Sequence, residues 1–290
     1  MAPAHRSRRL SRRLQNVIVF GATSAIAQAV CRLLARRKCR FYLIARDPAK
    51  LASVAADLSV RGGEIAGTGT ADLADTAVHA ALIAAAWRQL GSVDSAIVAY
   101  GVLGDQKEAE RSWAAAHVIL RTGFISVASL VTLLANEFEK QGFGQLVAIG
   151  SVAGDRGRKT NYVYGAAKGA VEILLQGVRH RLAPLGINVL LIKPGFVDTP
   201  MTAHLPKSPL FASVAAELLA RNPDVMALFR NNPFPAHDRP PTAIRMPVYR
   251  IGFTDLSTLR RTGRYWNKEY QGDFVPAVYL DAGGRIAGGG

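Results

Sequence analysis

The sequence predicts an α/β domain in which helices flank a doubly wound, mostly parallel sheet. Short apolar runs rich in β-branched residues alternate with longer segments whose apolar residues recur at three- and four-residue steps, such as "SAIAQAVCRLLARR" and "TAVHAALIAAAWRQL". This alternation is typical of repeated βαβ units. The chain has 290 residues, of which 49% are hydrophobic and 20% are charged. That composition is typical of a folded chain with one sizeable core.

Seven short apolar or β-branched runs are the predicted strands. Each one is short enough for a single strand and is followed by a turn or by a helical pattern. The two longest helical patterns cover residues 109–136 and 161–182. The predicted strands cover residues 17–20, 41–44, 64–70, 96–99, 145–149, 187–192 and 276–280.

The rhythm of strands and helices breaks after residue 193. Ten of the fourteen prolines fall between residues 194 and 247, and proline excludes long helices there. Because this excursion follows the sixth strand at the carboxyl edge of a parallel sheet, we expect a proline-rich substrate lid at about 200–270. A disordered insertion is the alternative. The predicted organisation is a basic, disordered arm at 1–15 and one domain at 16–290.

The formal net charge of +15 bears on partners and location. The first thirteen residues hold five arginines without a following apolar segment, so they do not predict a secretory signal. The apolar run at 122–136 is shorter than the roughly 18 residues that cross a bilayer. Cys31 and Cys39 lack neighbouring ligand residues, which favours free thiols in a reducing compartment and no metal site. We expect a cytoplasmic protein, with peripheral contact to an anionic membrane as an alternative; no nucleic-acid motif is present, so nucleic acid is disfavoured.

The segment "VIVFGATSAIAQAV" has the pattern of a strand, a tight turn and a helix start. Gly21 permits the turn. Backbone amides at a helix N-terminus bind pyrophosphate groups well. The predicted phosphate-binding residues after Gly21 are Thr23, Ser24, Ala25 and Ile26.

The second predicted strand ends in "LIARD". A dinucleotide site that prefers NAD carries an acid at this point for the ribose 2′-hydroxyl, whereas an arginine accommodates the 2′-phosphate of NADP. Ala45 offers no carboxylate, and Arg46 offers a guanidinium that pairs with phosphate. Asp47 is the competing residue, since a shift of the loop would bring its charge to the ribose. The pattern favours NADP(H) over NAD(H).

The segment "YVYGAAKGA" places Tyr164 and Lys168 one helical turn apart with only small residues between them. A nearby ammonium lowers the pKa of a phenol, and such a phenol can pass a proton near neutral pH. By themselves the two residues also fit a half-buried helix face. Ser151 in "LVAIGSVAG" ends the fifth strand thirteen residues before Tyr164, so the three side chains can converge.

With "PGFVDT" from Pro194 to Thr199, these motifs resemble the short-chain dehydrogenase/reductase family over about residues 16–201. The spacing of Ser151, Tyr164 and Lys168, followed by this segment, is the most specific part of the likeness. The resemblance implies a Rossmann-type sheet of about seven strands in the order 3-2-1-4-5-6-7. It also implies that NADP(H)-dependent hydride transfer interconverts a ketone and a secondary alcohol.

The resemblance also assigns roles to residues. Tyr164 would donate the proton, Ser151 would polarise the substrate carbonyl, and Lys168 would lower the tyrosine pKa and bond the nicotinamide ribose. Asp72 would meet the adenine, and Thr199 the nicotinamide carboxamide. The remaining cofactor-binding residues implied by position are Leu73, Tyr100, Gly101, Pro194, Gly195 and Val197. A homodimer or homotetramer is implied, with the helices at 109–136 and 161–182 facing their symmetry mates.

Three positions depart from the family pattern. Ala25 and Ala27 replace two glycines of the phosphate loop, and Val98–Gly101 replaces the usual Asn-Asn-Ala-Gly. The asparagine of the catalytic tetrad aligns by spacing with Gly123. In the family its main-chain carbonyl holds a water linked to the lysine at a helix kink, and a glycine keeps that carbonyl and tolerates a bulge.

These departures leave two alternative functions open. A catalytically weak nucleotide-binding scaffold or sensor would explain the altered loop and the missing asparagine. The segments "GATSAIA" and "AYGVLGDQ" instead resemble reductases of decaprenylphosphoryl keto-pentoses, so a polyprenyl-phosphate keto-sugar at a membrane surface is the other alternative.

Overall fold

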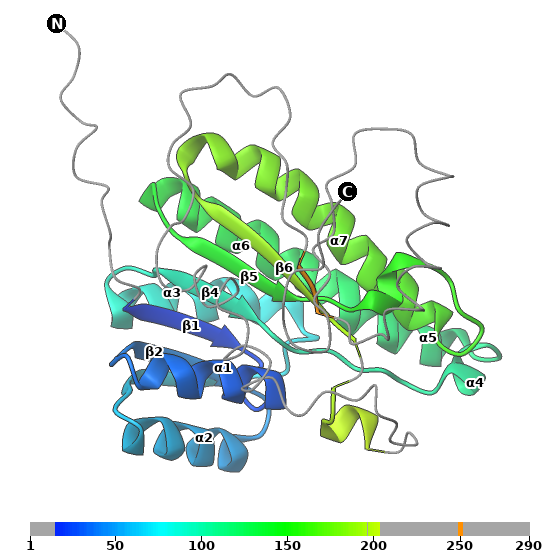
Figure 1. Cartoon of the computed structure of the whole chain (residues 1–290), viewed down its shortest axis with the longest axis horizontal. Coiled ribbons are helices and arrows are strands. Elements are labelled where there is room, and N and C mark those ends of the chain that lie inside the picture. Colours follow the sequence, from blue (N-terminus) through cyan, green and yellow to red (C-terminus); the bar gives the residue numbers. More distant parts are fainter. Residues whose placement is uncertain (1–14, 196, 204–248, 252–290) are drawn as a thin grey trace, which may run out of the picture.

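The computed structural model of the chain describes residues 15–195, 197–203 and 249–251, which form a parallel sheet with helices on both faces (Figure 1). The strand order β3-β2-β1-β4-β5-β6 confirms the predicted doubly wound sheet, and every pair of neighbouring strands is parallel. The strands are β1 (Asn16–Phe20), β2 (Arg40–Ala45), β3 (Glu64–Thr70), β4 (Ser95–Val98), β5 (Gln145–Ile149) and β6 (Asn188–Pro194).

The strand next to β6 differs from the prediction. The three residues of β7 (Tyr249–Ile251) pair in parallel with Ile192–Pro194. The run at 276–280, predicted as the seventh strand, lies outside the described residues, as do almost all of the predicted lid and the arm. No local pattern predicted β7, because a three-residue strand is too short to show any periodicity in the sequence.

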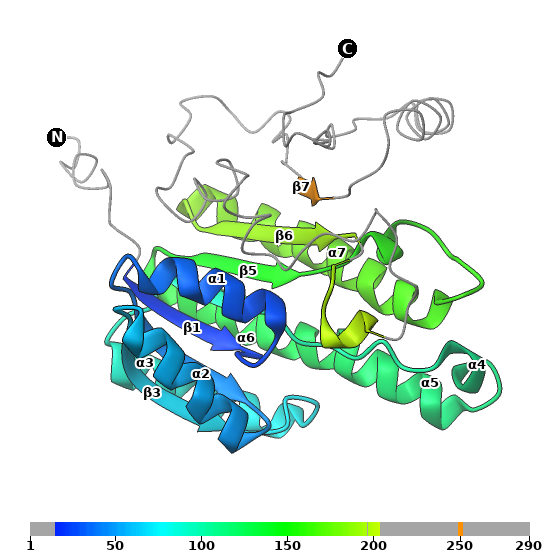
Figure 2. The ribbon, with the colours of Figure 1, turned by 60° about the horizontal axis from the view of Figure 1, so that its bottom comes forward.

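The sheet is covered on both faces because its strands bury both sets of alternating side chains. Val17 and Val19 face the core shared with α1 (Ala25–Ala35) and α2 (Pro48–Val60), whereas Ile18 and Phe20 face the opposite core. Figure 2 shows α1 in front of β1 and α6 behind the sheet. The helices of the second face are α3 (His79–Leu90), α6 (Ser126–Gln141) and α7 (Tyr162–Leu182).

The helix predicted at 109–136 is shifted and interrupted. A short α4 (Gln106–Ala109) precedes α5 (Trp113–Leu120), which continues through the π-helical turn η2 (Arg121–Ile125) into α6. In the part of the chain that the structure describes, this Trp113–Gln141 segment is the one helix long and apolar enough to cross a membrane, with a mean hydropathy of 2.0. The buried side of α6 packs in the core, which is how apolar helices of globular domains also behave.

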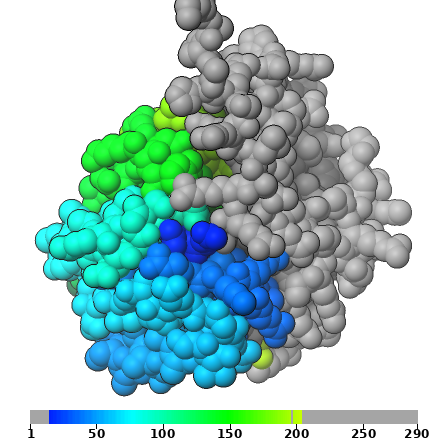
Figure 3. Space-filling model, turned by 90° about the vertical axis from the view of Figure 1, so that its left-hand side faces the viewer, coloured from blue at the N-terminus to red at the C-terminus, as the bar shows by residue number. Residues whose placement is uncertain are grey.

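The remaining short turns and the cysteines complete the framework. Cys31 and Cys39 are buried thiols that form no disulfide, and burial raises their pKa values to about 12 and 11. In the space-filling view, the blue and cyan residues of the first half form one continuous surface beside the green residues of the second half (Figure 3). The 3₁₀ turns are η1 (Thr76–Val78), η3 (Val152–Asp155), η4 (Ala183–Leu185) and η5 (Pro200–Thr202).

Candidate active site

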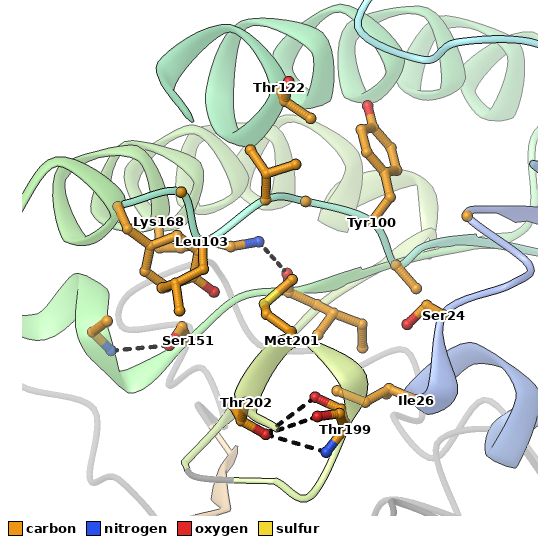
Figure 4. A pocket seen from close by; sticks show the side chains of 18 of the residues that line it. Ser24, Ile26, Tyr100, Leu103, Thr122, Ser151, Lys168, Thr199, Met201 and Thr202 are labelled. Carbon is orange, nitrogen blue, oxygen red and sulfur yellow. Dashed lines mark hydrogen bonds between the residues drawn. The ribbon is translucent and has the colours of Figure 1, made fainter. Parts of the chain in front are cut away.

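One cavity of about 1160 Å³ lies at the carboxyl edge of the sheet. That edge is where open α/β sheets bind ligands. Figure 4 shows Ser24 on one side of the cavity and Ser151 with Lys168 on the opposite side. All the site residues predicted from the sequence line this cavity: Gly21, Thr23, Ser24, Ala25, Ile26, Arg46, Asp72, Leu73, Tyr100, Gly101, Ser151, Tyr164, Lys168, Pro194, Gly195, Val197 and Thr199.

The turn between β1 and α1 depends on glycine. Gly21 has φ of +87°, and a Cβ there would lie 2.7 Å from the Cβ of Tyr100. A side chain at this position is therefore both strained and blocked. Ser24 is the N-cap of α1, but its hydroxyl does not cap the helix amides. The first turn of α1 thus presents backbone amides beside the cavity, as an anion-binding helix N-terminus requires.

The two charged residues after β2, Arg46 and Asp47, have different surroundings. Arg46 is exposed and lines the cavity. Asp47 instead caps α2, since its carboxylate accepts hydrogen bonds from the amides of Ala49 and Lys50, each at 3.0 Å. These backbone hydrogen bonds, led by that from Lys50, lower the pKa of Asp47. The carboxylate is held at the helix, whereas Arg46 faces the cavity.

The loop after β3 is held by buried hydrogen bonds. The Leu73 carbonyl accepts from His79 Nε2 at 3.0 Å and also from the Ser126 hydroxyl. Because a carbonyl cannot donate, Nε2 carries the proton, and Nδ1 accepts from Ser129 at 3.0 Å. Burial lowers the pKa of His79, which keeps this neutral tautomer. The Tyr100 hydroxyl donates to Ser126 and completes the network.

Ser151, Tyr164 and Lys168 come together from β5 and α7. Ser151 is the N-cap of η3, and its Oγ accepts from the Ala153 amide at 3.1 Å. Lys168 is 5% exposed, and its Nζ donates to the Ile149 carbonyl at 3.0 Å. The same Nζ lies 5.8 Å from the centroid of the Tyr164 ring. The structure thus places a hydroxyl, a phenol and an ammonium around one part of the cavity.

The predicted effect of Lys168 on the phenol is wrong for this structure. Burial raises the pKa of Tyr164 above 10, and a hydrogen bond with Ser151 acts in the opposite direction. Burial also lowers the pKa of Lys168, to about 8. Desolvation disfavours the charged form of both groups, and here it exceeds the attraction that the short spacing suggested.

Gly123 lies in the middle of the π-helical turn η2, so the bulge expected there is present. A Cβ on Gly123 would approach the Cβ of Ala167 on α7 to 3.2 Å. The helix that carries Tyr164 and Lys168 therefore passes close to the bulge. On the other side of α7, a Cβ on Gly165 would lie 2.7 Å from the Ala153 carbonyl oxygen. Small residues let the three segments approach backbone to backbone.

Comparison with known proteins identifies the family. The family model described as short chain dehydrogenase matches residues 15–209. The chain belongs to the short-chain dehydrogenase/reductase family. A second model, the lipase maturation factor C-terminal domain, matches residues 196–276, well under half of the chain.

Relatives and solved structures agree with this family. An uncharacterized oxidoreductase of Mycobacterium tuberculosis is 37% identical and is aligned over 70% of this chain and 81% of its own. A putative ketoacyl reductase of the granaticin polyketide synthase of Streptomyces violaceoruber is 34% identical over 65% and 70%. The crystal structure of levodione reductase matches with a TM-score of 0.62 and 25% identity, over 66% of this chain and 75% of that one.

Membership makes this protein an oxidoreductase of a family that binds nicotinamide cofactors. The cavity fits such a group. The volume of the cavity exceeds the roughly 300–1,000 Å³ of a typical small-molecule pocket. The amides of the first turn of α1 suit a pyrophosphate, and Arg46 supplies a cation nearby. In this short-chain dehydrogenase/reductase, Ala25 stands where the family loop has a glycine. Its added Cβ removes none of these amides.

Several residues of the cavity were not predicted from the sequence. Thr122, on η2, has no motif that marks it. Gln106 accepts a hydrogen bond from the Val163 amide at 3.2 Å and so connects α4 to the start of α7. Lys193 does not line the cavity, but it directly precedes Pro194, which does. It interrupts the apolar run of β6, and a buried lysine needs a partner; that signal was available in "VLLIKPG". Further unpredicted lining residues are Val102, Leu103, Arg158, Asn161, Met201 and Thr202.

Proposed function

We propose that the protein interconverts a ketone and a secondary alcohol by hydride transfer, with NADP(H) as the preferred cofactor and Tyr164 as the proton donor. The observation that carries this proposal is the convergence of Ser151, Tyr164 and Lys168 on the cavity that also holds the glycine turn. A ketone fits the printed name of the granaticin relative, a putative ketoacyl reductase.

Each of the three residues has a chemical task in the direction of reduction. The hydroxyl of Ser151 donates a hydrogen bond to the substrate carbonyl oxygen and orients it. Tyr164 gives its phenolic proton to that oxygen as negative charge develops on it. A nicotinamide cofactor bound in the cavity would supply the hydride for the carbonyl carbon. Burial keeps Tyr164 protonated, so the phenol carries the proton to be given, but the raised pKa opposes its release.

Lys168 compensates the negative charge that forms on Tyr164 during this step. Its ammonium stabilises the phenolate that remains after proton transfer. In the structure Nζ already donates to the Ile149 carbonyl, which holds the side chain toward the cavity (Figure 4). Gly101 borders the ammonium, since a Cβ at that position would lie 3.6 Å from Nζ, an ordinary van der Waals distance.

The adenosine end of the cofactor is assigned to the turn after β1 and the loops after β2 and β3. The amides at the start of α1 would hold the pyrophosphate, and Asp72 with Leu73 would bind the adenine. Arg46 would pair with the 2′-phosphate. Asp47 does not compete, because the α2 amides already hold its carboxylate.

The cofactor preference is testable by substitution. We expect NADPH to bind tighter than NADH by about ten- to a hundredfold, the worth of one charge-assisted contact. Arg46→Ala should reduce this difference mainly by weakening NADPH. Dissociation constants from fluorescence titration measure both effects. A matched control is Arg61→Ala on α2, whose guanidinium pairs with Asp57 instead. Equal affinities for both cofactors in the unmodified protein would refute the role of Arg46.

The reaction itself is tested with the whole chain. An NADPH fluorescence titration should show binding, and a panel of ketones should then oxidise NADPH in a time-dependent manner. Binding without turnover of any carbonyl would support a nucleotide-binding scaffold instead.

The basic composition is the specific observation for a second candidate, a polyprenyl-phosphate keto-sugar reductase at a membrane surface. Salt-sensitive pelleting with anionic vesicles, together with turnover of such a sugar, would support that candidate.

We also propose a homo-oligomer that forms through α5 and α7. Trp113 and Ile173 are each 71% exposed, and Val118 and Ile125 are about half exposed. Apolar side chains exposed on neighbouring helices indicate a protein–protein contact. Light scattering at micromolar concentration should give at least a dimer mass, and Ile173→Glu should lower it. A monomeric unmodified protein would exclude the proposal.

A further inference from the structure

The ammonium of Lys193 is buried at the end of β6, where the side chain is 1% exposed. Its Nζ pairs with the carboxylate of Asp155 and, at 2.6 Å, with that of Glu172. The two carboxylate side chains are themselves 8% and 19% exposed. One buried cation therefore joins two buried anions that are far apart in the sequence.

The three partners come from the three elements that carry the candidate active site. Lys193 directly precedes Pro194 on β6. Asp155 is the last residue of η3, the turn that Ser151 caps at its other end. Glu172 lies one helical turn beyond Lys168 on α7. The lysine thus connects the serine turn, the tyrosine helix and the strand that leads to Pro194.

A second cation, Arg179, lies near Glu172. Burial lowers the pKa of Arg179 to about 10, and the nearby Glu172 acts against that shift. Arg179 Nε also donates to the Val189 carbonyl at 2.6 Å. Arg179 thus lies near enough to Glu172 to be stabilised by its negative charge.

Stability alone does not account for this arrangement. Moving charges out of water opposes folding, and apolar side chains of similar volume often serve as well or better. An ion pair also fixes geometry, because an ammonium holds its acceptors at defined positions. A buried ion group is therefore best explained where a defined position is needed.

The serine turn packs closely against α7. It meets α7 through backbone atoms: a Cβ on Gly154 would lie 2.7 Å from the Gly169 amide nitrogen. Such a contact has few side chains that could interlock. The Ser151 end of the turn is held by hydrogen bonds from the Ala153 and Gly154 amides, and Arg158 donates to the Val152 carbonyl. At the other end, the Asp155 carboxylate ties the turn to Lys193, and the Glu172 carboxylate ties Lys193 to α7.

We propose that Lys193 is a positioning residue: by bridging Asp155 and Glu172 it fixes the Ser151 turn against α7. The Ser151 hydroxyl is thereby held at the position that the Tyr164 phenol requires. The inference deepens the proposed function and rests on it for the reaction that is affected.

The test removes the charges without changing the shapes. Lys193→Met alone leaves two carboxylates facing each other and can prevent folding. The triple variant Lys193→Met/Asp155→Asn/Glu172→Gln keeps similar volumes and should fold. We expect its kcat to fall by about ten- to a hundredfold, the range for a displaced catalytic group, with an unchanged NADPH dissociation constant. In a Ser151→Ala background, the same three changes should lower kcat by less than about twofold, because they act through Ser151.

A second measurement does not depend on turnover. Amide hydrogen exchange in a peptide that covers 151–155 should be at least about tenfold faster in the triple variant. Asp57→Asn is the matched control, because Asp57 pairs with Arg32 and Arg61 on the surface, away from the cavity. It should change neither kcat nor the exchange of the turn.

The outcomes separate this inference from the proposed function. If no ketone is turned over by the unmodified protein, the proposed function fails, while hydrogen exchange still decides whether Lys193 holds the turn. Unchanged exchange would overturn the inference. The inference would also be overturned if the three changes lowered kcat by the same factor in the Ser151→Ala background as in the unmodified protein. Such a result would show a general effect on the fold.

Discussion

Tyr164→Phe is expected to lower kcat by at least about a hundredfold, since a positioned proton donor contributes roughly 10²–10⁴-fold. Tyr164 is also predicted to contact the cofactor, but NADPH should still bind with a dissociation constant within about twofold, because the change removes one hydroxyl and keeps the aromatic ring. Steady-state kinetics with the best ketone of the panel and a fluorescence titration measure the two quantities.

Tyr162 provides the matched control for this change. It lies two residues earlier on the same helix, is 44% exposed, and has Ala166 at the position four residues on. Tyr162→Phe should therefore retain full activity. If Tyr164→Phe keeps more than about a tenth of the activity, the proton comes from another group and the assignment is wrong.

Lys168→Met should abolish most of the activity and yet stabilise the fold. The burial that lowers the Lys168 pKa from 10.5 to about 8 opposes folding by roughly 3 kcal/mol at pH 7. Loss of the hydrogen bond to the Ile149 carbonyl offsets about 1 kcal/mol of that gain. The net stabilisation of about 2 kcal/mol corresponds to a rise in Tm of roughly 4–8 °C. Thermal unfolding of both proteins measures it.

The pH dependence of this difference has a definite sign. In the unfolded chain Lys168 binds its proton up to about pH 10.5, whereas in the fold it loses the proton near pH 8. The unfolded chain therefore holds more protons between these values, and the fold gains stability from this residue as pH rises through them. The advantage of the Lys168→Met variant should be full below pH 8 and shrink toward pH 10.5.

An exposed lysine serves as the reference. Lys140 on α6 is 72% exposed and pairs with Glu137 at the surface. Lys140→Met should change the free energy of unfolding by no more than about 0.5 kcal/mol, and without this pH dependence. A Lys168→Met variant that melts below the unmodified protein would show that the hydrogen bond to Ile149 outweighs the burial of the charge.

Local patterns were sufficient for most of the framework. The six strands β1 to β6 begin and end within two residues of their predicted ranges. Five of them are buried on both faces and are therefore nearly continuous apolar runs, whereas β3 is a partly exposed edge strand. The glycine turn was predictable because the φ of Gly21 excludes other residues. The bulge at Gly123 also lies where the family spacing placed it. Strand β7 and the exact limits of α5 and α6 carry no comparable local signal.

The sequence alone determined which groups meet at the sheet edge: the order of strands follows from their connections, and the residues after parallel strands share one edge. Ser151 and Arg46 follow strands, and Tyr164 and Lys168 lie on the helix after β5, so all four were predictable as residues of one site, and all four line the cavity. Only the tertiary structure decided the electrostatics. The pKa of Tyr164 and the partners of Lys193 depend on which atoms replace water around them, and those atoms come from segments far apart in the chain. Spacing along a helix brings two charges close, but the depth of burial decides whether they remain charged.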